Sequence, residues 1–297
     1  WAEWCAKSAE VFNSIFDLGF GVVEVGTVTP LKQYGNPKPR ICRLIEDQAL
    51  INRLGFNNLG AENISSRIRF NRPKGLLGVN LGPNKDTQNR LNDYLVGFRA
   101  FYDLVDYITI NISSPNTENL REFHEEKKFD ELMTLIFNEK EKLNSDIPIV
   151  VKLSPDIKEE NIEKITSILI NYKVKAVIIS NTTEGNRENL KNISKHQKGG
   201  LSGKPLEKKS NLLINKFYTT MDEFSQNKDY EKAAIYRDRI SALRDIQRSQ
   251  SFAGFNGSRD AIYVSIKENK VKVGVTSVNE GWVTGQKNFI QMNGFEE

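Results

Sequence analysis

The segment Tyr107-Ile108-Thr109-Ile110-Asn111-Ile112-Ser113-Ser114-Pro115-Asn116-Thr117 begins with apolar and β-branched residues and becomes polar from Asn111 onwards. A short apolar run of this kind is typical of a parallel strand that is covered on both faces. Four other segments rich in valine, isoleucine and leucine have the same character, and they span residues 21–28, 76–81, 147–153 and 176–180. Together with residues 107–112, they predict the strands of one parallel sheet.

Helical patterns separate these predicted strands. Residues 129–143 and 157–172 each carry isoleucine or leucine at helical spacing, and Ser154-Pro155-Asp156 predicts a capped start for the second helix. Alternating strands and helices indicate βαβ units, and therefore an α/β fold that is either a barrel or a doubly wound sheet. Polar and glycine residues follow the strands, and in a (βα)8 barrel that edge carries the active site.

The composition narrows the class of protein. The chain has 297 residues, of which 38% are hydrophobic and 27% charged, so it is predicted to form one large domain or two medium ones. A net charge of +4 is too small to indicate nucleic-acid binding. No apolar run is long enough to span a membrane, and no signal peptide is recognisable.

Cysteine and histidine usage argues against a metal centre. Cys5 and Cys42 show neither metal-binding nor disulfide spacing, which favours a reducing, cytoplasmic setting. His124 and His196 lie in polar, loop-like stretches, where solvated side chains are expected. We therefore predict no metal site and no histidine-based triad.

The pattern changes after Pro205. Residues 221–250 are rich in charge and helical in pattern, with a break near Asn227 that predicts a helical hairpin. This change predicts a domain boundary near residues 208–218.

The end of the chain has the pattern of strands. Residues 261–266 and 270–275 alternate in character and flank Lys267-Glu268-Asn269, which suits a tight turn. A β-hairpin is therefore predicted there.

A series of short motifs occurs in the order that is found in class 2 dihydroorotate dehydrogenases. The motifs are Val25-Gly26-Thr27-Val28-Thr29-Pro30, Asn36-Pro37-Lys38-Pro39-Arg40, residues 50–58, Asn84-Lys85-Asp86, residues 111–117, Val151-Lys152-Leu153, Asn181-Thr182-Thr183 and residues 199–206. Each motif alone is weakly specific, but their common order makes residues 7–206 resemble this family closely. The resemblance implies a TIM-type barrel that holds FMN and oxidises dihydroorotate to orotate.

The family reaction gives Ser114 a role. In that family a base removes a proton from C5 of dihydroorotate, hydride leaves C6 for N5 of the flavin, and a quinone later reoxidises the flavin. By its place in the motif, the resemblance implies that Ser114 is the base, and serine where class 1 members carry cysteine points to the quinone-linked class. A serine hydroxyl needs a closed pocket or a relay to lose its proton. The alternative is that Ser113-Ser114-Pro115 only forms a turn after a strand.

Asparagine residues dominate the implied substrate site. Orotate is a planar ring with amide-like edges and a carboxylate, and asparagine can both donate to and accept from such edges, although it also marks loops. The resemblance implies substrate contacts from Lys7, Asn52, Arg53, Leu54, Gly55, Phe56, Asn111, Asn116, Asn181 and Thr182.

The implied flavin site centres on one lysine. Reduced flavin carries negative charge near N1 and O2, which a lysine at a strand end can stabilise. Lys152 lies in an otherwise apolar strand, where a charged side chain is costly unless it has a partner. Gly203 would let the backbone approach the cofactor closely. The resemblance implies flavin contacts from Thr27, Asn80, Asn111, Lys152, Ser180 and Gly203.

Two parts of the chain depart from the family pattern. Residues 2–7 replace the family's flavin-binding Ala-Ala-Gly-Phe-Asp-Lys, and the preceding strand and the helices by which family members attach peripherally to the inner membrane are not found. After Leu206 the last strands and the glycine-rich loops that hold the flavin phosphate are also not found. We therefore expect an incomplete TIM-type (βα)8 barrel over residues 1–210, in which truncation could impair activity and quinone access.

Residues 221–251 resemble the UVR motif of the UvrC excinuclease subunit, centred on Tyr230-Glu231-Lys232-Ala233-Ala234. The resemblance implies a helical hairpin over residues 217–251 that binds a UvrB-like partner, and a β-rich UvrC-like fragment over residues 252–297. Nuclease activity does not carry over. Two alternatives stay open: an ordinary amphipathic helical pair, and a non-enzymatic chimeric or degraded protein whose hairpin binds a DNA-repair partner.

Overall fold

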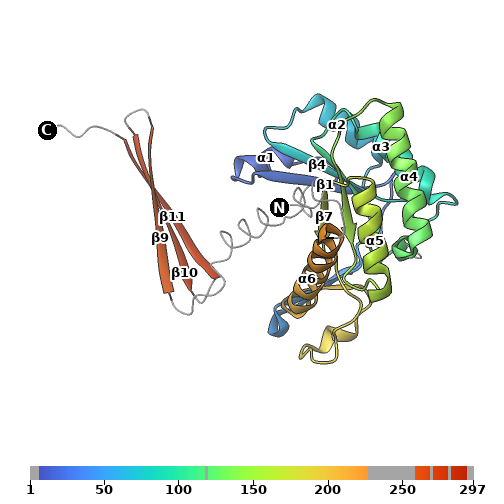
Figure 1. The fold of residues 1–297 in the computed structure, drawn as a ribbon. Helices are drawn as coiled ribbons and strands as arrows, with labels where there is room; N and C mark the ends of the chain where they lie inside the picture. Colours follow the sequence, from blue (N-terminus) through green and yellow to red (C-terminus); the bar gives the residue numbers. More distant parts are fainter. Residues whose placement is uncertain (1–6, 118–119, 227–257, 268–269, 280–281, 293–297) are drawn as a thin grey trace. The chain divides into compact units, whose positions relative to one another are not determined.

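The chain is described here by a computed structural model, in which residues 7–117, 120–226, 258–267, 270–279 and 282–292 are described (Figure 1). It divides into two compact units, Trp1–Glu223 and Phe224–Glu297. The first unit holds the predicted α/β fold, and the second holds a separate small sheet.

A parallel sheet forms the centre of the first unit. Its 5 strands lie in the order β1-β4-β5-β6-β7, and each neighbouring pair is parallel. Within the described residues the sheet is open at β1 and β7. This arrangement confirms the predicted α/β class and is consistent with an incomplete barrel. The strands are β1 (Val22–Val28), β4 (Leu76–Leu81), β5 (Tyr107–Asn111), β6 (Ile149–Leu153) and β7 (Ala176–Ile179).

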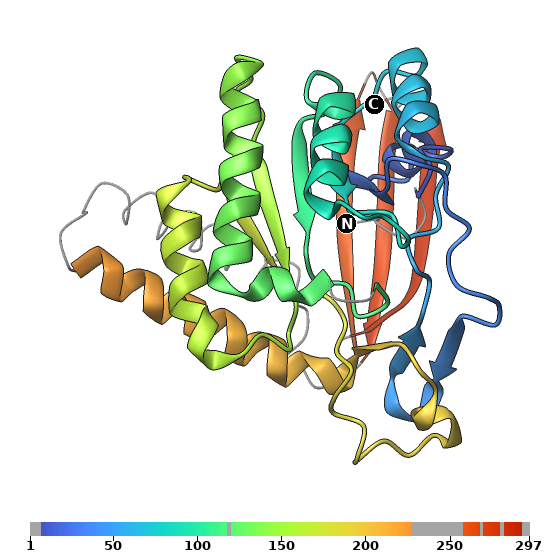
Figure 2. The ribbon, with the colours of Figure 1, turned by 90° about the vertical axis from the view of Figure 1, so that its right-hand side faces the viewer.

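Helices cover the outer face of this sheet (Figure 2). They contribute large side chains to one continuous core with the strands, among them Tyr94, Phe98 and Phe129, which are all fully buried. Burial of such aromatic side chains is the main source of stability for a fold of this kind. The helices are α1 (Phe12–Asp17), α2 (Ala61–Phe70), α3 (Arg90–Phe101), α4 (Glu126–Lys142), α5 (Glu159–Asn171) and α6 (Lys204–Gln226).

The predicted capped start of α5 is wrong. The helix begins at Glu159, and its N-cap residue is Lys158, which makes no capping hydrogen bond with its side chain. Ser154 instead accepts a hydrogen bond from the backbone N–H of Asp156, which closes a local turn before the helix. The Asp156 carboxylate is used in tertiary contacts that the local sequence does not reveal.

A second, antiparallel sheet was not predicted. It has the order β2-β3-β8 and joins β2 (Ile41–Leu44), β3 (Ala49–Asn52) and β8 (Gly200–Gly203). Its own small core contains Leu44, Ile51, Leu190 and Leu201. In its register, Asn52 lies opposite Gly200, so segments that are far apart in the sequence meet at this point. Short 3-10 helices complete the unit at Ile45–Asp47 (η1), Leu120–His124 (η2) and Ile193–His196 (η3).

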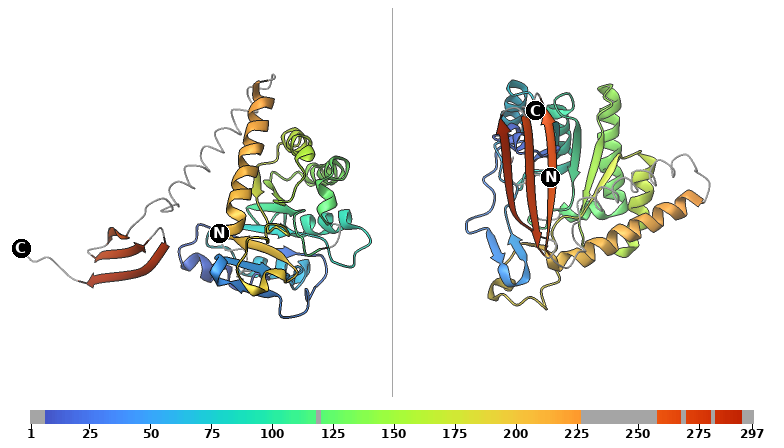
Figure 3. Two further views of the ribbon diagram at one scale, coloured as in Figure 1. Left: turned by 90° about the horizontal axis from the view of Figure 1, so that it is seen from below. Right: turned by 90° about the vertical axis from the view of Figure 1, so that its left-hand side faces the viewer.

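Helix α6 runs without interruption from Lys204 to Gln226 (Figure 3). Leu213 and Phe217 belong to the core of the first unit. The boundary predicted near residues 208–218 falls inside this helix, whereas the two compact units divide between Glu223 and Phe224. The predicted helical hairpin lies outside the described residues beyond Gln226.

The second unit contains an antiparallel sheet in the order β11-β10-β9. Its strands are β9 (Ser258–Lys267), β10 (Lys270–Asn279) and β11 (Trp282–Met292). Lys267 lies opposite Lys270, which confirms the predicted hairpin; its turn residues 268 and 269 lie outside the described residues. Among the described residues, no helix combines the length and apolar character that crossing a membrane requires.

Candidate active site

A cavity of about 340 Å³ lies at the carboxyl ends of the parallel strands. We call it the inner cavity. Thr27 of β1, Asn111 of β5 and Lys152 of β6 reach it from their strand ends, which is the edge where barrel enzymes hold their active sites. Its lining residues are Lys7, Thr27, Asn52, Leu54, Gly55, Phe56, Asn111, Ser114, Pro115, Asn116, Lys152, Ser180, Asn181, Thr182, Ser202 and Leu206.

Most of the residues predicted for the site meet in this cavity. Three of them do not line it. Arg53 faces a neighbouring cavity, Asn80 lies behind the wall, and Gly203 belongs to β8. Gly203 has a φ of +96°, and a Cβ there would lie 2.4 Å from the Gln48 carbonyl oxygen. A contact within the chain therefore requires this glycine, irrespective of any cofactor.

A buried hydrogen-bond network forms the floor beneath Thr27 and Asn111. The Asn80 side-chain oxygen accepts from the Thr27 hydroxyl at 2.8 Å and from the Asn111 amide nitrogen at 3.1 Å. The Asn80 amide nitrogen donates at 2.9 Å to the carboxylate of Glu24, which also accepts from the Thr109 hydroxyl at 2.7 Å. Glu24, Asn80 and Thr109 are fully buried. The network therefore gives the wall of the cavity a fixed pattern of donors and acceptors.

Asn111 occupies the centre of this network. Its amide nitrogen donates to Asn80 and Thr27, and its side-chain oxygen accepts from the backbone N–H and the hydroxyl of Ser113, at 3.1 and 2.7 Å. Since an asparagine side chain offers two donors and two acceptor lone pairs, the protein itself uses all of them. Direct contact between this side chain and a ligand would require one of these bonds to be exchanged.

Two further contacts hold the loop after β5. The Tyr94 hydroxyl donates to the Asn111 backbone carbonyl at 2.7 Å, and burial raises the pKa of this tyrosine. The Asn181 amide nitrogen donates to the Ser113 hydroxyl at 2.8 Å, which links the loop after β5 to the loop after β7. The local sequence gave no signal for Tyr94, because its partner lies 17 residues away.

Ser114 lies at the inner cavity with a largely buried side chain, 4% exposed. Its hydroxyl oxygen accepts a hydrogen bond from the Asn116 backbone N–H at 3.2 Å. A donor at this position favours the deprotonated form of an oxygen acid. The Asn116 side chain donates to the Asn52 backbone carbonyl at 3.3 Å, so the loop is also tied to β3.

Arg121 of η2 joins three loops at the site. Its guanidinium donates to the Ser113 carbonyl at 3.4 Å, to the Thr182 carbonyl at 3.1 Å and to Asp156 at 2.9 Å. Asp156 also accepts from Thr183 and from Lys209 of α6. Burial alone would raise the pKa of Asp156, but the hydrogen bonds from Lys209 and Thr183 and the charge of Arg121 hold it below its ordinary value. No local sequence pattern marks this ion-pair cluster, because its members come from distant parts of the chain.

His124 supports the same loops and corrects a prediction. The ring is 5% exposed and not solvated, whereas His196 is exposed as predicted. Nδ1 lies 2.9 Å from the Arg121 carbonyl oxygen, and Nε2 accepts from the Ser154 backbone N–H at 3.2 Å. Only the neutral ring protonated at Nδ1 satisfies both partners. Burial lowers the pKa of His124 to about 4. The prediction failed because Ser154 is 30 residues away in the sequence.

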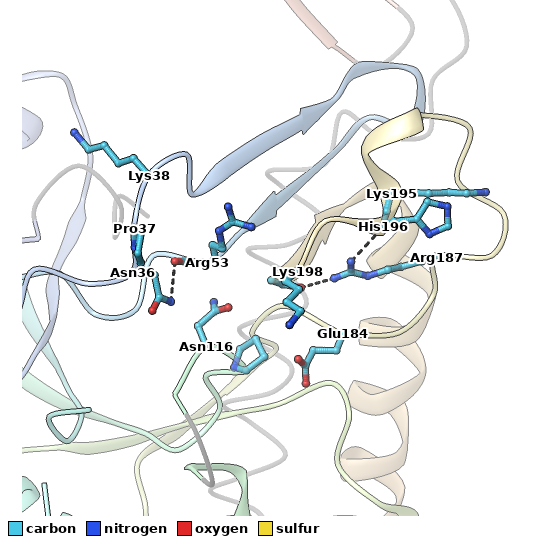
Figure 4. A pocket seen from close by; sticks show the side chains of 12 residues that line it. Asn36, Pro37, Lys38, Arg53, Asn116, Glu184, Arg187, Lys195, His196 and Lys198 are labelled. Carbon is cyan, nitrogen blue, oxygen red and sulfur yellow. Dashed lines mark hydrogen bonds between the residues drawn. The ribbon is translucent and has the colours of Figure 1, made fainter. Parts of the chain in front are cut away.

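A larger cavity of about 900 Å³ adjoins the inner one, and we call it the outer cavity (Figure 4). The two cavities share Pro115 and Asn116. Charged side chains make up half of the residues that line the outer cavity, and they are Lys38, Arg53, Glu184, Arg187, Lys195 and Lys198. Figure 4 shows Lys38 and Lys195 extending away from its centre, while Lys198 extends toward Glu184.

The comparison with known proteins decides the family. The family model for dihydroorotate dehydrogenase matches residues 1–224. The chain belongs to the dihydroorotate dehydrogenase family. This result agrees with the resemblance seen in the motifs of residues 7–206.

Dihydroorotate dehydrogenases (quinone) from other organisms are similar to more than two thirds of the chain. A dihydroorotate dehydrogenase (quinone) from Buchnera aphidicola subsp. Schizaphis graminum is 42% identical over 221 residues, which cover 72% of this chain and 66% of the relative. One from Bartonella tribocorum is 45% identical over 215 residues, covering 71% of this chain and 59% of the relative. The match therefore spans somewhat less than two thirds of these relatives.

Solved dihydroorotate dehydrogenase structures share the fold. The structure from Eimeria tenella in complex with ferulenol gives a TM-score of 0.70 at 35% identity, covering 74% of this chain and 65% of that one. The ligand-free form from the same organism gives the same TM-score and covers 67% of its chain.

A second family model overlaps the end of the dihydroorotate dehydrogenase match. The UvrB/uvrC motif matches residues 211–246. Leu213 and Phe217 lie within both matched ranges, and both are buried in the core of the first unit. The first residues of the UvrB/uvrC match therefore serve the dihydroorotate dehydrogenase fold.

Proposed function

We propose that this protein oxidises dihydroorotate to orotate with FMN as its cofactor and a quinone as electron acceptor, a step of pyrimidine biosynthesis. One observation carries the proposal: Ser114, four asparagines and Lys152 line one inner cavity at the carboxyl ends of the parallel strands. The asparagines are Asn52, Asn111, Asn116 and Asn181. The family membership and the quinone-linked relatives support the same reaction.

The residues of the inner cavity fit a flavin ring. FMN, when bound, supplies the hydride acceptor of the reaction. Lys152 is 6% exposed and lines the cavity, so its ammonium group would stabilise negative charge on a reduced ring. Thr27 and Ser180 line the same cavity with hydroxyl groups. Asn80 would act on the cofactor through Thr27, to which it is hydrogen-bonded.

The amide groups of the cavity suit a pyrimidine substrate. Asn52, Asn116 and Asn181 each offer donors and acceptors of the kind that match the N–H and C=O groups of the ring edge. Lys7 lines the cavity too and would pair with the substrate carboxylate. Thr182 and the segment from Leu54 to Phe56 close the remaining wall.

Ser114 would take the proton from C5 of the substrate as an alkoxide, after its hydroxyl proton has passed to solvent, and would return to the neutral hydroxyl. The Asn116 backbone N–H would stabilise the oxygen while it carries negative charge. Arg121 and Asn181 hold the adjacent Ser113, which fixes the loop on which Ser114 lies. The protein thereby limits the motion of the base relative to the substrate.

A steady-state assay of the full chain tests the proposal. The purified protein, supplied with FMN, dihydroorotate and a soluble quinone, should form orotate at a rate that depends on all three. The Ser114→Ala variant should lose roughly 10²–10⁴-fold in turnover, because a general base contributes about that factor. Ser65→Ala on α2, outside both cavities, is the matched control and should keep the wild-type rate. Absence of orotate formation by the FMN-loaded wild type would rule the proposal out.

The UvrB/uvrC match supports a further proposal, that residues 217–251 bind a UvrB-like protein. Because Leu213 and Phe217 are buried in the core of the first unit, the partner would contact matched residues beyond them. Binding of purified UvrB-like protein to the full chain, measured by titration, tests this. Charge reversal at Arg237 and Arg239 should abolish the binding, and undiminished binding would contradict the proposed mode.

A further inference from the structure

Glu24 is a carboxylate in the middle of an otherwise apolar strand. It belongs to β1, where Val23 and Val25 on either side are also fully buried. A fully buried carboxylate is costly unless its oxygens are satisfied. One oxygen accepts from the Asn80 amide nitrogen at 2.9 Å and the other from the Thr109 hydroxyl at 2.7 Å. Glu24 does not line the inner cavity, so its role must reach the cavity through its neighbours.

Both oxygens of Glu24 act as acceptors, and the acceptor that faces Asn80 fixes the orientation of that side chain. The amide nitrogen of Asn80 must face Glu24, so its oxygen must face the opposite way. That oxygen accepts from Thr27 and from Asn111. An amide in place of Glu24 presents a donor and an acceptor of nearly equal shape, so it would hold this orientation of Asn80 less strictly than the two acceptor oxygens do.

The network continues from Asn80 to the cavity wall, where backbone N–H groups fix the remaining amides. The Asn111 amide nitrogen donates to the Asn80 oxygen, and the Asn111 oxygen accepts from the Ser113 backbone N–H. The Asn181 oxygen likewise accepts from the Thr182 backbone N–H. Glu24 therefore acts on Asn80, and through Asn80 on the Thr27 hydroxyl at the cavity.

We propose that Glu24 is a positioning residue that orients Asn80 and, through Asn80, the Thr27 hydroxyl at the inner cavity. The inference rests on the proposed function, because it assigns this orientation to flavin binding. Thr27 lines the cavity and donates to the Asn80 oxygen, two hydrogen bonds away from the buried carboxylate. The acceptor character of residue 24, and not its size, is what the site requires.

Substitution of Glu24→Gln in the full chain tests this requirement. Glutamine keeps the size of the side chain and replaces one acceptor with a donor. FMN affinity, measured by quenching of flavin fluorescence, should fall roughly tenfold or more, since hydrogen bonds to charged groups contribute about that factor. The visible circular dichroism of the residual bound flavin should change as well, which a loss of stability alone would not produce.

A matched control and a rescue variant separate positioning from general damage. Glu139→Gln changes another buried carboxylate, which accepts from Arg99 at 2.7 Å and lies away from the inner cavity. It should leave FMN affinity within about twofold of wild type, well below the tenfold scale of a charged hydrogen bond.

In the double variant Glu24→Gln/Asn80→Asp, the new amide donates to the new carboxylate, whose other oxygen still accepts from Thr27 and Asn111. The double variant should bind FMN more tightly than Glu24→Gln alone.

Thermal unfolding of the flavin-free proteins tests the orientation set by Glu24 without relying on cofactor binding. The double variant should melt closer to wild type than either single variant does, because the pair restores a complementary donor and acceptor. Wild-type FMN affinity in Glu24→Gln, or a double variant that is no better than the singles in both measurements, would overturn the inference. A wild type that binds no FMN would contradict the proposed function, whereas the melting comparison would still decide the orientation set by Glu24.

Discussion

The inner and outer cavities share Pro115 and Asn116 but are built in opposite ways. The inner cavity is walled by buried amides and hydroxyls that are joined in a directional network, from Glu24 through Asn111 to Asn181. The outer cavity is lined by long charged side chains on loops, such as Lys38 and Lys198, which are exposed. Charged side chains in water have many conformations, so they hold a ligand less firmly than a fixed network does.

This difference indicates which of the two cavities should carry the chemistry. A site that stabilises a transition state needs groups that are already oriented and shielded from water. The inner cavity meets this condition, whereas the outer cavity is lined in part by exposed charged side chains such as Lys38 and Lys198. Substitutions in or directly behind the inner wall should therefore have large effects, and substitutions in the outer cavity should have small ones.

Among substitutions that leave Ser114 in place, the largest effect is expected at Lys152. Substitution of Lys152→Met keeps the aliphatic part of the side chain and removes the charge from the inner cavity. The loss of one group that stabilises developing charge costs roughly 10²–10³-fold in rate. The rate of flavin reduction by dihydroorotate, followed by stopped flow, should fall by about that factor. A reduction rate near that of wild type would contradict the claim that substitutions in the inner cavity have large effects.

A pH-dependent loss of stability should follow from His124. Its pKa is lowered to about 4 from an ordinary value of 6.5, so the unfolded chain binds the proton more tightly than the folded one. The stabilising contribution is therefore complete above pH 6.5 and is lost as the pH falls toward 4. At pH 5 the loss is on the order of 2 kcal/mol. Chemical denaturation at several pH values measures it.

The His124→Gln variant should show a smaller pH dependence of unfolding over this range, because the titrating ring is gone. The exposed His196 provides the matched control, and His196→Gln should behave as wild type does. Equal pH profiles for wild type and His124→Gln would show that the buried ring does not control the stability of these loops.

A smaller effect is expected for Arg121→Lys. Lysine retains the charge but cannot reach Ser113, Thr182 and Asp156 together as the planar guanidinium does. The free energy of unfolding should decrease by about 1–2 kcal/mol, and the Michaelis constant for dihydroorotate should rise because the loops after β5 and β7 are less well held. Unfolding and steady-state measurements on the same preparation check both. An unchanged Michaelis constant would limit the role of Arg121 to stability.

The smallest effect is expected in the outer cavity. Lys198 is exposed and extends from a loop, so Lys198→Gln should change turnover and substrate affinity by less than about twofold. Its main consequence should be a weaker dependence of the apparent association rate on salt, since surface charges act chiefly by steering. A loss of turnover comparable with that of Lys152→Met would show that the outer cavity takes part in the chemistry.

The sequence predicted the parallel sheet well because each of its strands is a short apolar run that can be recognised in the local sequence. The observed bounds of β4 are those predicted, and β1, β5, β6 and β7 differ by at most two residues at an end. The sheet of β2, β3 and β8 escaped prediction because β2 and β8 are not continuous apolar runs, and because β3 pairs with β8 from a distant part of the chain. Pairing of that kind leaves no periodic pattern in a short segment.

The site shows the same division. Motifs brought most cavity residues to notice, but the groups that support them were missed, since their partners lie far away in the sequence. Glu24 is an exception that could have been found. It interrupts an apolar strand just as Lys152 does, and a charged residue inside such a strand is a signal that can be read from the sequence. Asp156 could not have been found, because its local context suggested a helix cap.

Anaerobic flavin titration of the full chain tests most directly whether the inner cavity is a dihydroorotate-oxidising flavin site. The protein is loaded with FMN, freed of excess cofactor and treated with dihydroorotate while the visible flavin absorbance is recorded. We predict that FMN is retained in stoichiometric amount and that its absorbance bleaches on addition of dihydroorotate. Loss of all FMN during removal of the excess, or a bound flavin that stays oxidised in the presence of dihydroorotate, would contradict the account.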